Sequence, residues 1–456
     1  MAQKPSIPKG TRDFSPLEVQ RRQYIMNIIQ RHFELYGFMP IETPSFENSD
    51  TLMGKYGEEG DRLIFKILNS GEYLKKADPD LLETGKENQL TAQISEKALR
   101  YDLTVPFARY VVQNQNDIIF PFKRYQMQNV WRADRPQKGR FREFTQCDAD
   151  VVGSNSLFQE VELVQLYDAV FTNLKLNGCT IKINNRKVLA GIAEVMGAED
   201  KLIDFTVALD KLDKIGKEKV QEEMLSKGID QQAIDVLDPV FSLSGTYAEK
   251  IASIKELLQN SEIGLKGIEE LEFINTSITQ MPLKSAVLDL DITLARGLNY
   301  YTGCIFEVAA PEGVAMGSIG GGGRYDDLTG IFGLKDVSGV GISFGLDRIY
   351  LVMEQLGLFP DSVRAGVEVL FINFGMKEAQ YCSLWLSRFR ESGIKSELYP
   401  DAAKMKKQMS YADRNVIPYV ILAGEDEITT GKLNLKNMAS GKQSLLTPEE
   451  IISKLS

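Results

Sequence analysis

The stretch that decides the fold is FKRYQMQNVWRADRPQKGRFREFTQCDADVVG, residues 122–153. Apolar and polar side chains alternate from about residue 118 on both sides of a polar loop, RADRPQKGR, and this pattern predicts two antiparallel strands. From Lys123 to Arg142 the chain holds seven cationic residues and one acidic residue, Asp134. A purely solvated hairpin has no need of such one-sided charge, so we favour a site for nucleoside triphosphate, RNA phosphate or both.

The residue types in this hairpin suit phosphate groups and a base. Arginine presents a planar fork of donors that matches phosphate oxygens, which makes Arg132, Arg140 and Arg142 candidate phosphate ligands. Phe144 follows two residues later, and its aromatic face is suited to stacking on a base.

Acidic and amide side chains accompany these cations. Asp102 and Thr104 stand in RYDLTVPFARY, and Gln146 and Asp150 stand in FTQCDAD. Residues 146 and 150 face the same side of a strand because side chains alternate along it. A carboxylate among arginines is either a structural counter-charge or, if it faces a pocket, a partner for an ammonium group or an imidazole N–H.

Residues 294–307, LARGLNYYTGCIFE, place a cation and two phenols before an apolar, strand-like stretch. One interpretation is a surface turn between two strands. The other is a fixed cation, Arg296, together with Tyr300 and Tyr301 at the mouth of a strand.

A glycine run, SIGGGGRYDDL, occupies residues 318–328. The sequence has no G-x-x-x-x-G-K-[ST] phosphate loop, and the run lacks the strand–GxGxxG–helix frame of a dinucleotide site. Four glycines allow a close approach to the backbone, so the run predicts either a tight bulge or a ligand-binding strand with Arg324 or Tyr325 beside the ligand. In GISFGLDRI, Arg348 lies at a strand–helix junction as a surface ion pair or another phosphate ligand.

The composition limits the class of protein. The 456 residues are 43% hydrophobic and 25% charged, as in globular chains of two or three domains. A net charge of −10 argues against a uniformly basic surface but not against a local basic patch. The single histidine, His32, argues against a histidine general base, and the four cysteines form no CxxC pair, which argues against a disulfide scaffold or a zinc site. With no apolar run of ~18 residues and no signal-peptide core, we expect a cytoplasmic protein without a membrane span.

The pattern along the chain indicates several parts. An opening helix is expected over residues 15–37, and a strand over 38–47 that Pro40 and Pro44 confine to an edge or an interface. Helical spacing dominates residues 181–285, including IKINNRKVLAG at their start. Strand patterns resume at 285, and after residue 360 a βαβαβ pattern predicts a separate domain with a small parallel or mixed sheet.

Taken together and in order, KGTRDFSP, the 122–153 hairpin, LARGLNYYTG, GGGGRYDDL and GVGISFGLDRI resemble the histidyl-tRNA synthetases. The resemblance spans nearly the whole chain and implies an α+β fold of the class II synthetase type. It implies an antiparallel-sheet catalytic core over residues 1–180 and 286–355, a helical insertion domain over 181–285 and a C-terminal α/β anticodon-binding domain over 365–456. The hairpin corresponds to motif 2, GVGISFGLDRI to motif 3, and ELYGFMPIETPSFE to motif 1, around which such proteins form homodimers.

The resemblance implies a histidine–tRNA ligase, which activates L-histidine with ATP to histidyl-adenylate and transfers it to the 3′ end of tRNA(His). Mg²⁺ is expected with the ATP, and its protein ligands are unknown. The nucleophile is already an anion, so adenylation needs no general base, in agreement with the single histidine of the chain. The alternatives are a catalytically inactive, synthetase-like regulatory or tRNA-sensing protein and a class II enzyme with another amino-acid specificity.

The resemblance also implies roles for individual residues. Arg296 and Arg132 would be catalytic, at the histidine carboxylate and the α-phosphate. The implied histidine site comprises Asp102, Leu103, Thr104, Arg132, Gln146, Asp150, Arg296, Tyr300, Tyr301 and Tyr325, and the implied ATP site comprises Arg132, Arg140, Arg142, Phe144 and Arg348. Many bacterial members have glutamate where this chain has Asp102, Asp134 and Asp150, and aspartate where it has Asn299. These are chemically similar changes that affect fine geometry rather than the reaction.

Overall fold

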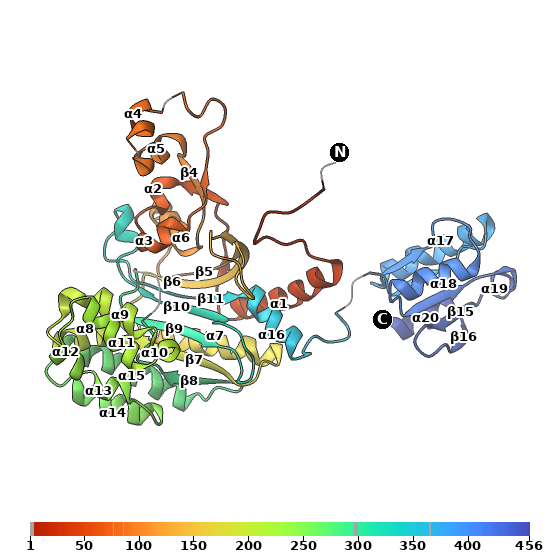
Figure 1. Ribbon diagram of the computed structural model, residues 1–456. Helices are drawn as coiled ribbons and strands as arrows, with labels where there is room; N and C mark the ends of the chain where they lie inside the picture. The colour runs from red at the N-terminus through yellow and green to blue at the C-terminus, as the bar shows by residue number, and fades with distance from the viewer. Residues whose placement is uncertain (1–3, 76, 85, 296–299, 364–365) are drawn as a thin grey trace. The chain divides into compact units, whose positions relative to one another are not determined.

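The computed structural model describes residues 4–75, 77–84, 86–295, 300–363 and 366–456 (Figure 1). Contacts divide the chain into two compact units, one of Met1–Asp13 and Arg21–Pro360 and one of Phe14–Gln20 and Asp361–Ser456. Within the described ranges no helix is long and apolar enough to cross a membrane. The same ranges contain no group of three or more His, Cys, Asp or Glu side chains placed to hold a metal ion.

A mainly antiparallel sheet organises the large unit. Its eight described strands lie in the order β1-β5-β6-β11-β10-β9-β7-β8, in which only the end pairs β1/β5 and β7/β8 are parallel. The bounds are β1 Met39–Pro40, β5 Phe122–Trp131, β6 Glu143–Val152, β7 Cys179–Asn185, β8 Ala286–Leu290, β9 Cys304–Ala309, β10 Gly320–Tyr325 and β11 Gly339–Gly345. The hairpin and the α+β class expected from the sequence are confirmed, with β5 and β6 paired over their whole length.

The two faces of β6 have opposite characters. Residues 147, 149 and 151 are buried in the main apolar core, and residues 146, 148 and 150 point to the other face. Helix α7 (Phe158–Leu174) contributes to this core, where the Tyr167 ring lies 4.8 Å from that of Phe344 on β11. Helix α16 (Leu346–Gln355) follows β11 directly, as the strand–helix junction predicts. The polar face of β6 is therefore presented on a rigid, well-packed sheet.

The segment 38–47 does not form the single strand that its pattern predicts. Its start is β1 at the edge of the large sheet, and its end enters β2 of a separate three-stranded sheet, β2-β4-β3. Pro44 lies between them and has no N–H to donate to a ladder, which explains the break. The remaining bounds here are β2 Phe46–Asn48, β3 Lys66–Ile67, β4 Lys97–Leu99, α1 Pro16–Leu35, α2 Ser49–Leu52, α3 Gly57–Arg62, α4 Pro79–Glu83, α5 Glu87–Ile94 and α6 Thr104–Gln113.

A group of helices lies beside β7 and β8, at the end of the large sheet away from β2–β4 (Figure 1). Their bounds are α8 Arg186–Val195, η1 Glu199–Lys201, α9 Leu202–Leu209, α10 Leu212–Ile215, α11 Lys217–Ser226, α12 Gln231–Asp235, α13 Asp238–Phe241, α14 Tyr247–Leu257 and α15 Glu262–Gln280. The helical spacing expected from residue 181 is wrong for residues 181–185, which belong to β7. Ile181 and Ile183 are fully buried and alternate with polar residues, which is strand periodicity.

The smaller unit contains a five-stranded sheet of order β13-β12-β14-β15-β16 among its described residues. Parallel pairing of β12 with β13 and β14 confirms the βαβαβ pattern, and two antiparallel strands extend the sheet beyond it. The bounds are β12 Val369–Phe371, α17 Met376–Glu391, β13 Ser396–Leu398, α18 Met405–Arg414, β14 Tyr419–Leu422, α19 Glu425–Thr430, β15 Leu433–Asn437, β16 Gln443–Leu446 and α20 Pro448–Leu455.

Candidate active site

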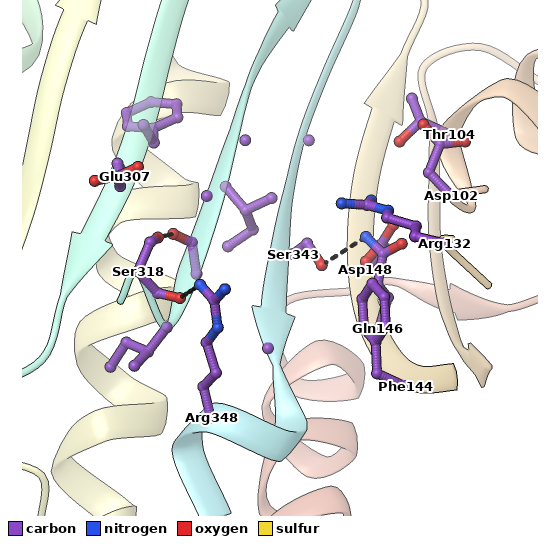
Figure 2. A pocket seen from close by; sticks show the side chains of 18 of the residues that line it. Asp102, Thr104, Arg132, Phe144, Gln146, Asp148, Glu307, Ser318, Ser343 and Arg348 are labelled. Atoms are coloured by element: carbon purple, nitrogen blue, oxygen red, sulfur yellow. Dashed lines mark hydrogen bonds between the residues drawn. The ribbon is translucent and has the colours of Figure 1, made fainter. Parts of the chain in front are cut away.

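A cavity of about 310 Å³ opens on the polar face of the large sheet (Figure 2). The glycine run forms β10 at the middle of this face, in unbroken register with β9 and β11, so it is a strand and not a bulge. Gly320, Gly321 and Gly322 line the cavity with bare backbone. Of the two neighbours considered for a ligand, Tyr325 lines the cavity, whereas Arg324 is buried in an ion pair with Glu160.

Most of the sequence candidates meet at this cavity. The lining includes Asp102, Thr104, Arg132, Arg140, Phe144, Gln146, Asp150, Tyr300, Tyr301, Tyr325 and Arg348. Leu103 is buried in the apolar interior and does not line the cavity. Arg142 is also absent from the lining, because its guanidinium donates to the backbone carbonyls of Asp134 and Lys9. Arg296 lies outside the described residues.

Two guanidinium groups, Arg140 and Arg348, form what we call the arginine end of the cavity, and a third, Arg132, lines the cavity beside Asp102. Figure 2 shows Arg348 next to Ser318 and Arg132 next to Asp102, Asp148 and Gln146, with Ser343 between the two groups. Arg348 Nε donates to the Gly139 carbonyl at 2.8 Å, and a second nitrogen donates to the Ser318 carbonyl. Burial, and then repulsion from Arg140 and Arg132, lowers the pKa of Arg348 from its ordinary value. Cations held close together in this way form a ready site for a polyanion.

Arg132 is fixed by aromatic rings as well as by the backbone. Its Nε donates to the Tyr101 carbonyl at 3.0 Å, and its guanidinium carbon lies 4.2 Å from the Tyr101 ring centroid and 5.2 Å from that of Phe144. Stacking between two rings limits the rotamers of this long side chain. The terminal nitrogens are therefore aimed before any ligand arrives.

Three buried carboxylates form the carboxylate end: Asp102, Asp148 and Asp150, none more than 3% exposed. Asp102 accepts hydrogen bonds from the Tyr56 hydroxyl at 2.9 Å, the Tyr300 hydroxyl at 3.1 Å and the Val105 N–H at 3.2 Å. Burial raises the pKa of Asp102, while Arg132 and these hydrogen bonds oppose the rise. The Asp102 carboxylate is thus held at one position in the wall.

Asp150 is held from two sides. The Tyr325 hydroxyl donates to its Oδ1 at 2.6 Å, and the guanidinium of fully buried Arg124 lies 2.7 Å from its Oδ2. Space for the carboxylate exists because Gly341 lies opposite on β11; a Cβ there would be 2.0 Å from Oδ1. Burial raises the pKa of Asp150, and Arg124 counteracts the rise.

Asp148 was not among the residues selected from the sequence. It lines the cavity between Gln146 and Asp150, and its Oδ1 has no hydrogen-bond partner among the described residues. Burial raises its pKa to about 7, with nearby Asp150 and Asp102 adding to the rise and Arg124 opposing it. Strand alternation could have identified Asp148 from the sequence, because the alternation that puts residues 146 and 150 on one face of the strand puts residue 148 there too.

Two further residues were missed for a different reason. Arg124 and Tyr56 hold Asp150 and Asp102, but they stand 26 and 46 positions away in the sequence. Only strand register places Arg124 opposite Asp150, and only the packing of the α3 region places Tyr56 beside Asp102.

Neutral phenols complete the carboxylate end. Ring centroids of Tyr300 and Tyr301 lie 4.9 Å apart, and those of Tyr300 and Tyr325 lie 6.1 Å apart. Burial and the nearby carboxylates raise the pKa of all three phenols, so they stay protonated and can donate. Beside them, Gln146 Nε2 donates to the Ser343 hydroxyl at 3.2 Å, and Gln146 Oε1 has no partner among the described residues (Figure 2).

Comparison with known proteins gives a consistent result. Residues 83–349 match the family model described as Histidyl-tRNA synthetase, and residues 368–456 match the one described as Anticodon binding domain. The histidine–tRNA ligases of Christiangramia forsetii and Flavobacterium johnsoniae are 72% and 65% identical, over 98% and 97% of both chains. The crystal structure of the histidyl-tRNA synthetase from Nostoc sp. PCC 7120 is similar over 100% of both chains, with a TM-score of 0.83 and 30% identity.

Proposed function

The chain belongs to the histidyl-tRNA synthetase family and acts as a histidine–tRNA ligase, and we propose that histidine and ATP react in the cavity on the large sheet. The observation that carries this proposal is that one cavity is lined by Arg140 and Arg348 at one end, by the buried carboxylates Asp102, Asp148 and Asp150 at the other, and by Arg132 beside Asp102. ATP brings phosphate anions, and histidine brings an ammonium group and an imidazole N–H. The two ends of the cavity are complementary to these groups.

At the carboxylate end, Asp102, Thr104 and Gln146 would bind the α-amino group of histidine. Asp102 offers a fixed acceptor, and Gln146 has an unused buried amide oxygen. Asp150 would accept the imidazole N–H, with Tyr301 and Tyr325 beside the ring. A substrate without an imidazole would leave these buried polar groups unpaired, which can reject analogues by ~10⁴-fold or more.

Arg132, beside Asp102, would contact the α-phosphate. At the arginine end, Arg140 and Arg348 would contact the outer phosphates, and Phe144 would stack on the adenine. We also propose that Arg296 stands between the histidine carboxylate and the α-phosphate. Leu103 and Arg142, which do not line the cavity, would support its wall and its loop from behind.

The chemistry follows from these positions. A carboxylate oxygen of histidine attacks the α-phosphorus, and pyrophosphate leaves with the electron pair of the broken P–O bond. A ribose hydroxyl at the 3′ end of the tRNA then attacks the carbonyl carbon and loses its proton, while AMP leaves with the electron pair of the broken C–O bond. Because the first nucleophile is an anion, the rate depends on positioning and charge stabilisation, and removing one preorganised donor typically costs ~10²–10³-fold in kcat.

Mg²⁺ would accompany the ATP and neutralise charge on its outer phosphates. Protein sites for this ion usually supply one or two carboxylates and leave the rest to phosphate and water. Glu307 lines the cavity, and we propose its carboxylate as the principal protein ligand. Asp134 and Asp347 also line the cavity, and Asp347 is already paired with Arg12 and Arg22, which leaves Asp134 as the other candidate ligand.

We further propose the division into a catalytic core (1–180 and 286–355), an insertion domain (181–285) and an anticodon-binding domain (365–456), and a cytoplasmic location. Homodimerisation is proposed through residues 34–47. In support of this, β1 is an edge strand, and Met39 and Phe46 are 53% and 49% exposed. Light scattering should report about twice the 51.1 kDa of one chain, and a monomer would contradict this part of the proposal.

Histidine-dependent exchange of pyrophosphate into ATP tests the assignment. Arg132→Ala should slow the exchange by ~10²-fold or more, because it removes an aimed donor. Arg135→Ala is the matched control, since Arg135 is an exposed cation of the same loop that does not line the cavity. An equal loss in both variants would show that the net charge of the loop matters rather than the aimed guanidinium. No exchange in the wild-type protein would favour a regulatory or tRNA-sensing role.

A further inference from the structure

Residues 8–12 form a compact turn beside the hairpin loop (residues 132–142). The Thr11 N–H and hydroxyl both bond to the Pro8 carbonyl, at 3.2 and 2.8 Å. Gly10 has a φ of +89°, which side-chain-bearing residues rarely adopt. The turn therefore has a defined shape that depends on glycine at this position.

The turn is hydrogen-bonded to Arg142, at the end of the hairpin loop. The Arg142 N–H donates to the Gly10 carbonyl at 2.8 Å, and its guanidinium donates to the Lys9 carbonyl at 3.4 Å. Arg142 in turn accepts a hydrogen bond from the Arg132 N–H at 2.9 Å. A displacement of the turn would therefore displace Arg142 and Arg132, the two ends of the loop that also carries Arg140.

Gly10 is packed against this loop without spare room. A Cβ at residue 10 would lie 2.8 Å from Arg142 Cγ and 2.9 Å from Pro136 Cγ. The proline ring is rigid, so the loop would have to move to accept a side chain here.

Arg12 connects the turn to a second element. Its guanidinium pairs with Asp347, in the first turn of α16, and its carbon lies 3.3 Å from the centroid of the Phe141 ring. Phe141 adjoins Arg140 in the sequence, and Asp347 adjoins Arg348. Arg12 therefore connects the hairpin loop, which carries Arg140, with α16, which carries Arg348.

We propose that residues 8–12 act as a clamp that fixes the hairpin loop relative to α16, with Gly10 and Arg12 as positioning residues for Arg140 and Arg348. This inference rests on the proposed function, because it takes Arg140 and Arg348 to be ligands of the outer phosphates. Neither clamp residue lines the cavity, so both act through other side chains. Positioning of this kind matters because a displacement of about 1 Å can cost ~10²-fold in rate.

The clamp predicts a selective effect on ATP. Gly10→Ala should raise the KM for ATP in pyrophosphate exchange by ~10-fold or more, whereas the KM for histidine should stay within about twofold. Gly71→Ala is the matched control: Gly71 also has a positive φ, +78°, but a Cβ there meets nothing within 4 Å. A purely structural role for Gly10 would lower the Tm in both variants and leave the ratio of the two KM values unchanged.

Arg12 provides a milder test if Gly10→Ala folds poorly. Asp347 keeps Arg22 and the Thr145 N–H as partners, so Arg12→Ala leaves no unpaired buried carboxylate. Arg12→Ala should raise the KM for ATP, and Arg12→Lys should restore it only in part, because lysine keeps the charge but loses the flat stacking on Phe141.

Arg140→Ala, measured in parallel, separates failure of the clamp from failure of the proposed function. An unchanged KM for ATP in Arg140→Ala would overturn the role of that arginine. A raised KM in Arg140→Ala with normal values in both Gly10→Ala and Arg12→Ala would overturn the clamp alone.

Discussion

The arginine end and the carboxylate end of the cavity hold their charges in opposite ways. Arg348 at the arginine end donates hydrogen bonds to neutral backbone carbonyls and lies near other cations. Nearby acidic side chains therefore compensate its positive charge only in part. At the carboxylate end, Asp102 accepts hydrogen bonds from two phenols, and Asp150 accepts one from a phenol and forms an ion pair with a buried guanidinium. The first arrangement stores repulsion that a polyanion relieves, and the second provides an aligned polar surface for a small, specific ligand.

This difference predicts which substitutions affect ligand binding and which affect the stability of the fold. Removing an arginine from the arginine end relieves repulsion, so the fold should tolerate the change while ATP binding suffers. Removing Arg124, which is the counter-charge of Asp150 at the carboxylate end, leaves a buried carboxylate uncompensated, so the fold itself should suffer.

The largest expected effect on stability is at Arg124. Arg124→Met removes a fully buried cation and leaves the Asp150 carboxylate without its counter-charge, which should lower the free energy of unfolding by ~3–5 kcal/mol. Urea denaturation measures this loss. The double variant Arg124→Met/Asp150→Asn should recover part of it, because no unpaired charge then remains. Additive losses would mean that the two groups do not compensate each other.

Arg348→Ala should show the reverse pattern. It removes a guanidinium whose burial and cationic neighbours already disfavour its charge, so the free energy of unfolding should change by less than ~1.5 kcal/mol. The rate of pyrophosphate exchange should fall by ~10²-fold because an aimed phosphate donor is lost. A large loss of stability in urea with near-normal exchange would abolish the distinction between the two ends.

A third expected effect is the pH dependence that Asp148 contributes to stability. With its pKa raised from 3.8 to about 7, Asp148 keeps its proton between about pH 4 and 7 in the folded state and loses it in the unfolded state. The folded state then binds more protons, so this contribution to stability is complete below about pH 4 and is lost as the pH rises through about 7.

Asp148→Asn removes that dependence. The difference in Tm between pH 5 and pH 8 should therefore be smaller in Asp148→Asn than in the wild-type protein. Glu312→Gln, an exposed carboxylate whose side chain does not line the cavity, is a suitable control. An unchanged difference in Tm would mean that Asp148 is ionised throughout this range.

Sequence periodicity predicted the parts of the fold that depend on local pattern. The hairpin, the strand–helix junction before Arg348 and the βαβαβ region were all read from alternation and turn residues, and each is present. Local pattern gave a wrong prediction at residues 181–185, where a short strand precedes a long helical region. It was also wrong at residues 38–47, where Pro44 divides one apparent strand between two sheets.

The sequence predicted most residues that line the cavity, but not the residues that hold the lining side chains in place. Gln146 and Asp150 share a face by alternation, and the same rule decides between Arg324 and Tyr325, since consecutive residues of β10 point to opposite faces. Arg124 and Tyr56 could not be found in this way, because their partners are set by register and by packing between distant segments. Arg142 looked like a phosphate ligand by residue type, yet its donors are used by the backbone around it.

The most direct test of the separated cavity is a crystal structure with histidine and a non-hydrolysable ATP analogue bound together. The account predicts the imidazole N–H on the Asp150 carboxylate, the α-phosphate within hydrogen-bonding distance of Arg132, and the outer phosphates on Arg140 and Arg348. An imidazole at the arginine end, or phosphates that contact none of these three guanidinium groups, would contradict it.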